Sequence, residues 1–186
     1  MHVPAAAALA SLLLLLAPAR AQVYDLIPPP GGSPAANTDT FADRFTLQPR
    51  AAGGDGVIDT VCDDVAVAAL LLRRGVLTDR QGRIGSIVAN RQFQFDGPPA
   101  QAGAVYTAGW SISEREGLLY LGMQSQFFCC WAGQCACPPP PPPPPPRTGR
   151  VRGRPPLTRA DNNLYDRWIG DQCVPCYFGI TRIVQC

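Results

Sequence analysis

The sequence predicts an all-β fold, a small antiparallel domain braced by disulfides and built as a barrel, a trefoil-like barrel or a sandwich. Strand and turn signals follow one another at close spacing between Gly75 and Trp110. Eight cysteines follow an N-terminal export signal. Two segments, residues 22–56 and 135–161, have compositions that are too rich in Pro, Gly or Arg for a packed core, so we expect both to be disordered.

Residues 1–21 have the features of a secretory signal peptide. An apolar stretch that ends with Leu12–Leu16 is followed by Ala-Pro-Ala-Arg-Ala, whose small residues allow cleavage after Ala21. The stretch is shorter than the roughly 20 residues that a membrane span needs, and no later run is long enough. We therefore expect an exported chain without a membrane span, an uncleaved N-terminal anchor being the alternative. Residues 22–56 would then form a flexible leader or a propeptide.

Composition removes several classes of catalysis from the mature chain. His2 is the only histidine and lies in the signal peptide, and the sequence contains no lysine. A histidine-based triad, a histidine zinc site and a lysine Schiff base are therefore excluded. The formal net charge of +2 gives no electrostatic support for nucleic-acid binding, and no cofactor is expected.

Alternating side chains predict two strands within the region of close strand and turn signals. The first, residues 91–95, ends at Asp96–Pro99, because Gly97 tolerates a positive φ and the two prolines cannot continue a ladder. The second, residues 104–112, places Tyr106 and Trp110 on one face. Strands at this spacing favour an antiparallel sheet.

The remaining strand candidates lie on both sides of these two. Thr78–Gly82 predicts a tight connection between a strand that ends near Leu77 and a strand over residues 83–88. The apolar run Val65–Leu72 fits a helix or a strand by its periodicity alone. Three further candidates are Leu118–Leu121, Gln126–Cys130 and Tyr177–Val184.

The cysteines of an exported chain are expected to form disulfides, because the compartment is oxidising. Disulfides would also offset the limited core of a small β domain. The sequence does not give the connectivity, since eight cysteines allow 105 pairings. Zinc binding or redox chemistry, for which Cys173-Val-Pro-Cys176 has a suitable spacing, is the less favoured alternative. The cysteines are Cys62, Cys129, Cys130, Cys135, Cys137, Cys173, Cys176 and Cys186.

Residues 135–161 differ in composition from the strand-rich sequence around them. Nine prolines, Pro138–Pro146, favour a stiff polyproline II rod, and the arginines that follow form a basic segment. Such a segment could bind a proline-recognising module or meet phosphorylated mannan. We favour two other interpretations, a solvated loop insertion or translated intron sequence from a faulty gene model.

Three parts of the sequence together resemble a known family. They are GVLTDRQGRIGSIVANRQFQFDGPPAQAGAVYTAGW (residues 75–110), NNLYDRW (residues 162–168) and Cys173. They closely resemble the C-terminal cysteine domain of fungal PIR cell-wall proteins, the proteins with internal repeats. The resemblance extends from Cys62 to Cys186 apart from the insert, and we place the domain at residues 57–186. It also implies that the apolar run before Gly75 contains a strand.

The resemblance implies which cysteines are the principal disulfide candidates. The family domain has four, and the matching positions are Cys62, Cys130, Cys173 and Cys186. The other four cysteines of this chain have no counterpart. The family's repeats carry a glutamine that forms an ester with wall glucan, and no internal repeat is visible here, so we assign that role to no residue.

The function that the resemblance implies is a secreted structural constituent of the fungal cell wall, which organises the wall without catalysis. Its implied partners are wall β-1,3-glucan and wall mannoproteins, the latter through disulfides. Its implied location is extracellular, in the wall.

Two other functions remain as alternatives. A carbohydrate-binding module would use Tyr106 and Trp110 as stacking surfaces for sugar rings, although burial of this face in the core is favoured. A glycoside hydrolase would need a pair of carboxylates, and Glu114 and Glu116 are the only glutamates. We expect these two to form a solvated charged turn, so hydrolysis is the least favoured function.

Overall fold

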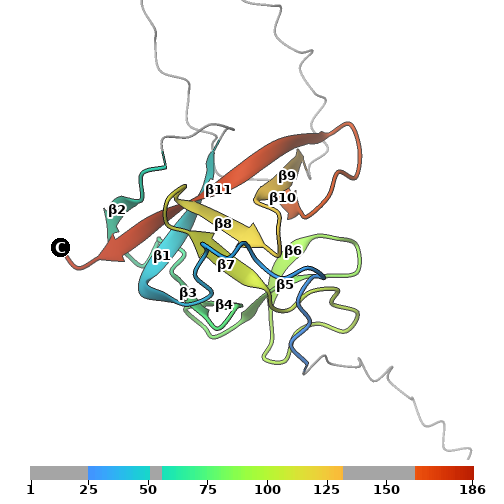
Figure 1. The fold of residues 1–186 in the computed structure, drawn as a ribbon, viewed down its shortest axis with the longest axis horizontal. Coiled ribbons are helices and arrows are strands. Elements are labelled where there is room, and N and C mark those ends of the chain that lie inside the picture. The colour runs from blue at the N-terminus through green and yellow to red at the C-terminus, as the bar shows by residue number, and fades with distance from the viewer. Residues whose placement is uncertain (1–24, 51–55, 132–161) are drawn as a thin grey trace, which may run out of the picture.

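The computed structural model describes residues 25–50, 56–131 and 162–186, and every regular element in them is a β-strand (Figure 1). No helix in this part of the chain is long and apolar enough to cross a membrane. The strands are β1 (Phe41–Arg50), β2 (Asp59–Cys62), β3 (Leu70–Arg73), β4 (Val76–Asp79), β5 (Ile84–Ile87), β6 (Phe93–Asp96), β7 (Trp110–Ser113), β8 (Leu118–Leu121), β9 (Gln126–Trp131), β10 (Asn162–Tyr165) and β11 (Cys173–Val184).

The strands form a nearly closed antiparallel barrel, so the predicted all-β, disulfide-braced class is confirmed. Neighbouring strands follow the order β10-β9-β11-β1-β3-β4-β5-β6. The β7–β8 hairpin joins this sheet through β11, and β2 pairs with β11 in parallel, the one departure from antiparallel pairing among the described strands. An isolated bridge between Gln92 and Tyr165 brings the β6 end of the sheet back to β10. This near-closure protects most of the two edges of the sheet, which would otherwise be exposed.

Strand β1 overturns the prediction that residues 22–56 form a disordered leader or propeptide, as far as residues 25–50 are concerned. It lies inside the sheet, between β11 and β3, and Phe41 and Phe45 are buried. Its register shifts between these two phenylalanines, and the exposed Asp43 interrupts the alternation of apolar residues there. That irregularity removed the period-2 signal from which a strand is predicted.

The segment before β1 also packs on the barrel. The backbone N–H of Ile27 donates to the Thr107 hydroxyl at 2.8 Å, and the N–H of Thr107 donates to the Ile27 carbonyl at 2.9 Å. Thr38 forms a two-way backbone pair with Ile112 in β7. The folded domain therefore begins well before residue 57. The predicted signal peptide and the Pro/Arg-rich insert lie outside the described residues.

Two predicted strands are shorter in the structure than in the sequence pattern. The apolar run Val65–Leu72 contributes only its last residues to a strand, β3. Of residues 104–112, only Trp110–Ile112 are in strand β7, and Tyr106 makes an isolated bridge to Ile87 instead. Gly109 has a φ of +87°, a conformation that ends a regular strand and favours glycine. The expectation of one continuous strand over 104–112 is therefore wrong.

The main apolar cluster of the core has a chain of aromatic rings through it, and a smaller buried cluster contains Cys130, Tyr165 and Cys173. The rings of Phe93 and Trp110 lie 5.2 Å apart, those of Trp110 and Phe127 lie 6.1 Å apart, and those of Phe127 and Phe178 lie 5.5 Å apart. These contacts connect β6, β7, β9 and β11, so they join opposite sides of the barrel. The largest fully buried apolar side chains are Trp110, Phe45, Phe127, Leu72, Leu77, Ile87, Ile112, Leu119 and Ile180.

Three disulfides brace the described part of the chain. Cys62–Cys186 ties the end of β2 to the C-terminal residue, and Cys130–Cys173 and Cys129–Cys176 both join β9 to β11. The four cysteines that the resemblance implied therefore pair with one another. Cys129 and Cys176, which had no counterpart in the family, form the additional bond. Cys135 and Cys137 lie outside the described residues.

Candidate functional site

An ion pair between Arg91 and Asp166 lies where the two edges of the sheet meet. The Arg91 Nε donates to Asp166 Oδ1 at 3.0 Å, and its Nη2 donates to Oδ2, which makes a two-point contact. The side chains are 18% and 4% exposed, so the pair is largely removed from solvent. Arg91 belongs to the first of the sequence segments that carried the family resemblance, and Asp166 to the second. The two motifs therefore meet at one contact.

The backbone holds Arg91 in an unusual conformation. Its φ is +72°, which is uncommon for a residue with a side chain. Its N–H donates to the Val88 carbonyl at 2.8 Å, and its own carbonyl accepts the N–H of Asp166 at 3.2 Å. Burial lowers the pKa of Arg91, but its interactions with Asp166 and Tyr106 outweigh burial, so the pKa is raised overall. The guanidinium therefore stays charged throughout the ordinary pH range.

A pocket of about 530 Å³ opens beside this ion pair. Tyr106 lines it, and the Arg91 guanidinium lies 5.3 Å from the centre of the tyrosine ring. Such a cation–π contact fixes both side chains. Leu121, Met123 and Gln124 line the pocket from the β8–β9 turn. The volume falls in the range of small-molecule sites, which is roughly 300–1,000 Å³.

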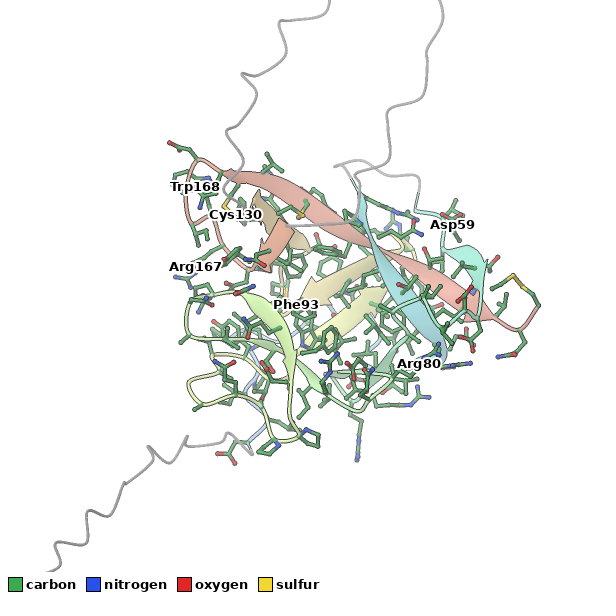
Figure 2. All side chains as sticks on the ribbon, turned by 180° about the vertical axis from the view of Figure 1, so that it is seen from behind. Asp59, Arg80, Phe93, Cys130, Arg167 and Trp168 are labelled. Atoms are coloured by element: carbon green, nitrogen blue, oxygen red, sulfur yellow. A yellow bond between two sulfur atoms is a disulfide. The ribbon has the colours of Figure 1, made fainter. Side chains whose placement is uncertain are left out.

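Two polar side chains of the pocket wall keep unused hydrogen-bonding capacity. Gln124 donates its side-chain N–H groups to the carbonyls of Asp166 and Gln126, at 2.9 and 3.2 Å, which leaves its Oε1 as an acceptor. Arg167 is exposed and has no ion pair with any residue in the described ranges. Figure 2 shows Arg167 and Trp168 at the same edge of the domain, on the side opposite Asp59 and Arg80.

The two predicted sugar-stacking residues have different environments. Trp110 is 1% exposed, and its indole N–H donates to the Gly85 carbonyl at 2.9 Å, so it cannot stack on a ligand. The stacking role considered for Trp110 is therefore wrong, because the side chain fills the core. Tyr106 is half-buried and lines the pocket. Trp168 is exposed, at 56%.

The carboxylates considered for glycoside hydrolysis do not gather in the structure. Glu114 is exposed and lies 3.6 Å from the Arg182 guanidinium, and Glu116 accepts a hydrogen bond from the Tyr120 hydroxyl. Burial, followed by that hydrogen bond, raises the pKa of Tyr120. Asp79 accepts a 2.6 Å hydrogen bond from Arg83. Within the described ranges, no three metal-binding side chains lie close enough to hold an ion.

A second charged cluster surrounds Asp63, next to the Cys62–Cys186 disulfide. Arg44 and Arg80 each donate to its carboxylate at 2.7 Å, and Gln185 donates at 3.2 Å. The hydrogen bond from Arg44 is the main cause of a lowered Asp63 pKa; partial burial opposes it, and Arg80 reinforces it. The cluster connects β1, the β4–β5 turn and the C-terminus.

The sequence did not identify Arg91, Gln124 or Asp166 as members of one site. From the sequence, Asp166 was placed only within the motif NNLYDRW, and Arg91 only within a predicted strand. The available signal is the carboxylate of Asp166 next to the apolar residues Leu164 and Tyr165 of the motif NNLYDRW, because a carboxylate that is buried needs a partner. Its partner lies 75 residues away in the sequence.

Comparisons with known proteins agree with the motifs. Residues 75–137 match the family model for the C-terminal domain of PIR1-like cell wall mannoproteins. The cell wall mannoprotein CIS3 of Saccharomyces cerevisiae is 41% identical over 128 residues, which are 69% of this chain and 44% of that protein. The cell wall protein PIR5 of the same species is 37% identical over 153 residues, which are 81% of this chain and 44% of that protein. No solved structure matches the chain.

The chain spans less than half the length of these two relatives. The relatives are fungal cell wall proteins, which confirms the predicted location outside the cell, in the wall. The chain therefore contains the C-terminal cysteine domain found in the PIR family of fungal cell wall mannoproteins.

Proposed function

We propose that this protein is a non-enzymatic structural constituent of the fungal cell wall that contributes to wall organisation and integrity. The observation that carries the proposal is the family match over residues 75–137, together with relatives that are themselves wall proteins. A barrel held by three disulfides suits a protein that must persist outside the cell, where no cellular machinery refolds it.

The charged residues support a structural role over a catalytic one. Asp166 and Asp79 are each neutralised by an arginine, and the two glutamates lie on or beside an exposed turn. A glycosidase acid needs an environment that raises its pKa, such as an apolar pocket or a neighbouring carboxylate. Neither aspartate lies in such an environment, since each is paired with an arginine.

We further propose wall β-1,3-glucan and wall mannoproteins as the partners. For a disulfide link to another protein, Cys62–Cys186 is the accessible bond, because both of its cysteines are exposed. Cys130, Cys173 and Cys176 are all less than a tenth exposed. An external thiolate would attack one sulfur of Cys62–Cys186, form a mixed disulfide and release the other cysteine as a thiolate.

The non-enzymatic part is tested with the purified chain and purified wall glucans. We expect no release of reducing sugar above a heat-denatured sample. Release of sugar that is abolished in a single carboxylate variant, such as Glu116→Gln, would overturn it. The structural part is tested by deleting the gene: we expect greater sensitivity to a wall-binding dye, restored by the full chain. Unchanged sensitivity in a strain without other family members would contradict it.

A further inference from the structure

We propose that the pocket beside the Arg91–Asp166 ion pair is a binding subsite for a neutral, hydroxyl-rich carbohydrate. The proposal extends the proposed wall function. It rests on that function only because the wall would be the source of the carbohydrate. The proposed subsite does not use the buried Trp110. Its binding groups are the Tyr106 ring, the Gln124 amide oxygen and the Arg167 guanidinium.

The framework of the pocket is held by contacts that need no ligand. The bidentate pair with Asp166 and the cation–π contact with Tyr106 fix the Arg91 side chain from two directions. Gln124 is fixed through its two donor contacts. Pro29 closes the pocket from the segment before β1. It packs so closely on Gly109 and Gly122 that a Cβ atom would approach it to 2.5 and 3.0 Å respectively.

The charge balance favours a neutral ligand. Arg91 donates to both carboxylate oxygens of Asp166, so the charges of these two side chains neutralise each other. Of the charged side chains that line the pocket, this leaves one uncompensated charge, on Arg167, which is exposed to solvent. A phosphate or carboxylate bound there would meet a single screened guanidinium, and exposed charge pairs contribute little.

The unused polar groups suit a ligand that both donates and accepts hydrogen bonds. Gln124 Oε1 can only accept, and the Arg167 guanidinium can only donate. A sugar hydroxyl does both, so adjacent hydroxyls of one ring can satisfy the two residues together. A carboxylate offers no donor to Gln124, and a hydrocarbon satisfies neither residue.

The remaining wall suits the C–H faces of a sugar ring. Pro29, Pro30 and Met123 present apolar surface, and Met123 is 61% exposed. Tyr106 adds part of an aromatic ring beside these residues. A pocket with apolar walls and a few convergent polar groups is the usual form of a small-ligand site.

The test is a calorimetric titration of the full mature chain with three probes: a linear β-linked glucose hexamer, a linear mannose hexamer and inorganic phosphate. We expect saturable binding of at least one neutral hexamer. Gln124→Ala and Arg167→Ala should each weaken it by about tenfold, the effect of one lost hydrogen bond. The matched control is Arg115→Ala, an equally exposed arginine on the β7–β8 turn, at the other end of β8, which should leave binding unchanged.

Three results would overturn the subsite: no binding of either hexamer, hexamer binding that both variants retain, or binding of phosphate alone. Failure here is separable from failure of the wall function. A chain that is retained in cell walls but binds no hexamer disproves the subsite only. A chain that binds a hexamer through Gln124 and Arg167 but occurs only in the medium disproves the wall role only. Near-ultraviolet circular dichroism of each variant checks that its fold is intact.

Discussion

Arg91 and Asp166 are 75 residues apart in the sequence, and their buried two-point ion pair joins the two ends of an almost closed sheet. The backbone bridge between Gln92 and Tyr165 lies directly beside it. Between the two ends of the sheet, side-chain contacts therefore close the gap that the backbone hydrogen bonds leave open. The same pair forms one wall of the pocket, so closure of the barrel and the shape of the candidate site depend on one interaction.

Arg91→Ala should destabilise the domain strongly. The variant leaves the buried Asp166 carboxylate without its counter-charge, which costs about 3–5 kcal/mol of unfolding free energy. Guanidinium denaturation with the disulfides intact measures the loss. Asp43→Ala, which removes an exposed ion pair with Arg182, is the control and should cost less than about 1 kcal/mol. Replacing both partners, as Arg91→Met with Asp166→Leu, should recover part of the lost unfolding free energy. Equal effects of Arg91→Ala and Asp43→Ala would contradict the role of Arg91 in a buried, stabilising ion pair.

Trp110→Ala should cost about 3–5 kcal/mol of stability, because it removes a fully buried aromatic side chain. It also leaves the Gly85 carbonyl without its indole donor. The matched control is Trp168→Ala, at an exposed position, which should change stability by less than about 0.5 kcal/mol. Thermal unfolding followed by far-ultraviolet circular dichroism distinguishes the two. The reverse order of effects would place Trp110 on the surface.

Mild reduction should open Cys62–Cys186 before the other two described disulfides. Both of its cysteines are exposed, whereas Cys130–Cys173 is buried at both ends and Cys176 is buried in the third bond. Access of the attacking thiolate controls the rate of exchange. Alkylation after timed exposure to low concentrations of reductant, followed by peptide mapping, measures the order. Earlier labelling of Cys130 or Cys173 would contradict this order.

The Asp63 cluster should make stability depend on pH. The folded state lowers the Asp63 pKa below its ordinary value of 3.8, so the ionised carboxylate stabilises the fold above about pH 4. That contribution is lost as the pH falls through the lowered, folded-state pKa. Asp63→Asn should therefore be less stable than the parent at pH 7, and the difference should shrink in strong acid.

The control for this pH effect is Asp171→Asn, at an exposed carboxylate in the β10–β11 connection. It should give the same stability difference from the parent at both pH values. Urea denaturation at pH 7 and at pH 2.5 measures the stability difference of each of the two variants from the parent. A difference for Asp63→Asn that stays constant between the two pH values would show that its charge is not responsible.

Removal of residues 22–50 should prevent folding, whereas a chain that begins at Gln22 should fold. The truncation deletes β1, which pairs with β11 on one side and β3 on the other, and it exposes their unpaired edges. Limited proteolysis and the yield of secreted protein report the result. A stable, protease-resistant product that begins at residue 51 would restore the idea of a dispensable propeptide.

The sequence predicted those parts of the fold that rest on local signals. The turn at Thr78–Gly82 has its tight backbone hydrogen bond between Gly82 and Asp79, and β3, β8 and β11 lie within or near their predicted segments. The alternation of apolar and polar residues did not predict β1, where a register shift separates Phe41 from Phe45. It also failed after Tyr106, where Gly109 turns the chain before β7.

The pocket could not be predicted because its members come from separate elements. Arg91 follows β5, Gln124 precedes β9, and Asp166 follows β10, so only the circular order of the sheet brings them together. Periodicity within one segment carries no information on that order. Pro29 belongs to a segment whose composition predicted disorder, and its position is set by packing on Gly109 and Gly122.

The central claim is that this chain resides in the fungal cell wall, and its partition between wall and medium tests that claim most directly. The full chain, expressed in a fungus that lacks its own copy, is quantified by mass spectrometry of β11 peptides in detergent-washed walls and in the medium. The account predicts that most of the protein stays in the washed walls and that reductant, mild alkali or glucanase releases it. Recovery of the protein only from the medium, with none released from the walls by any of the three treatments, would contradict it.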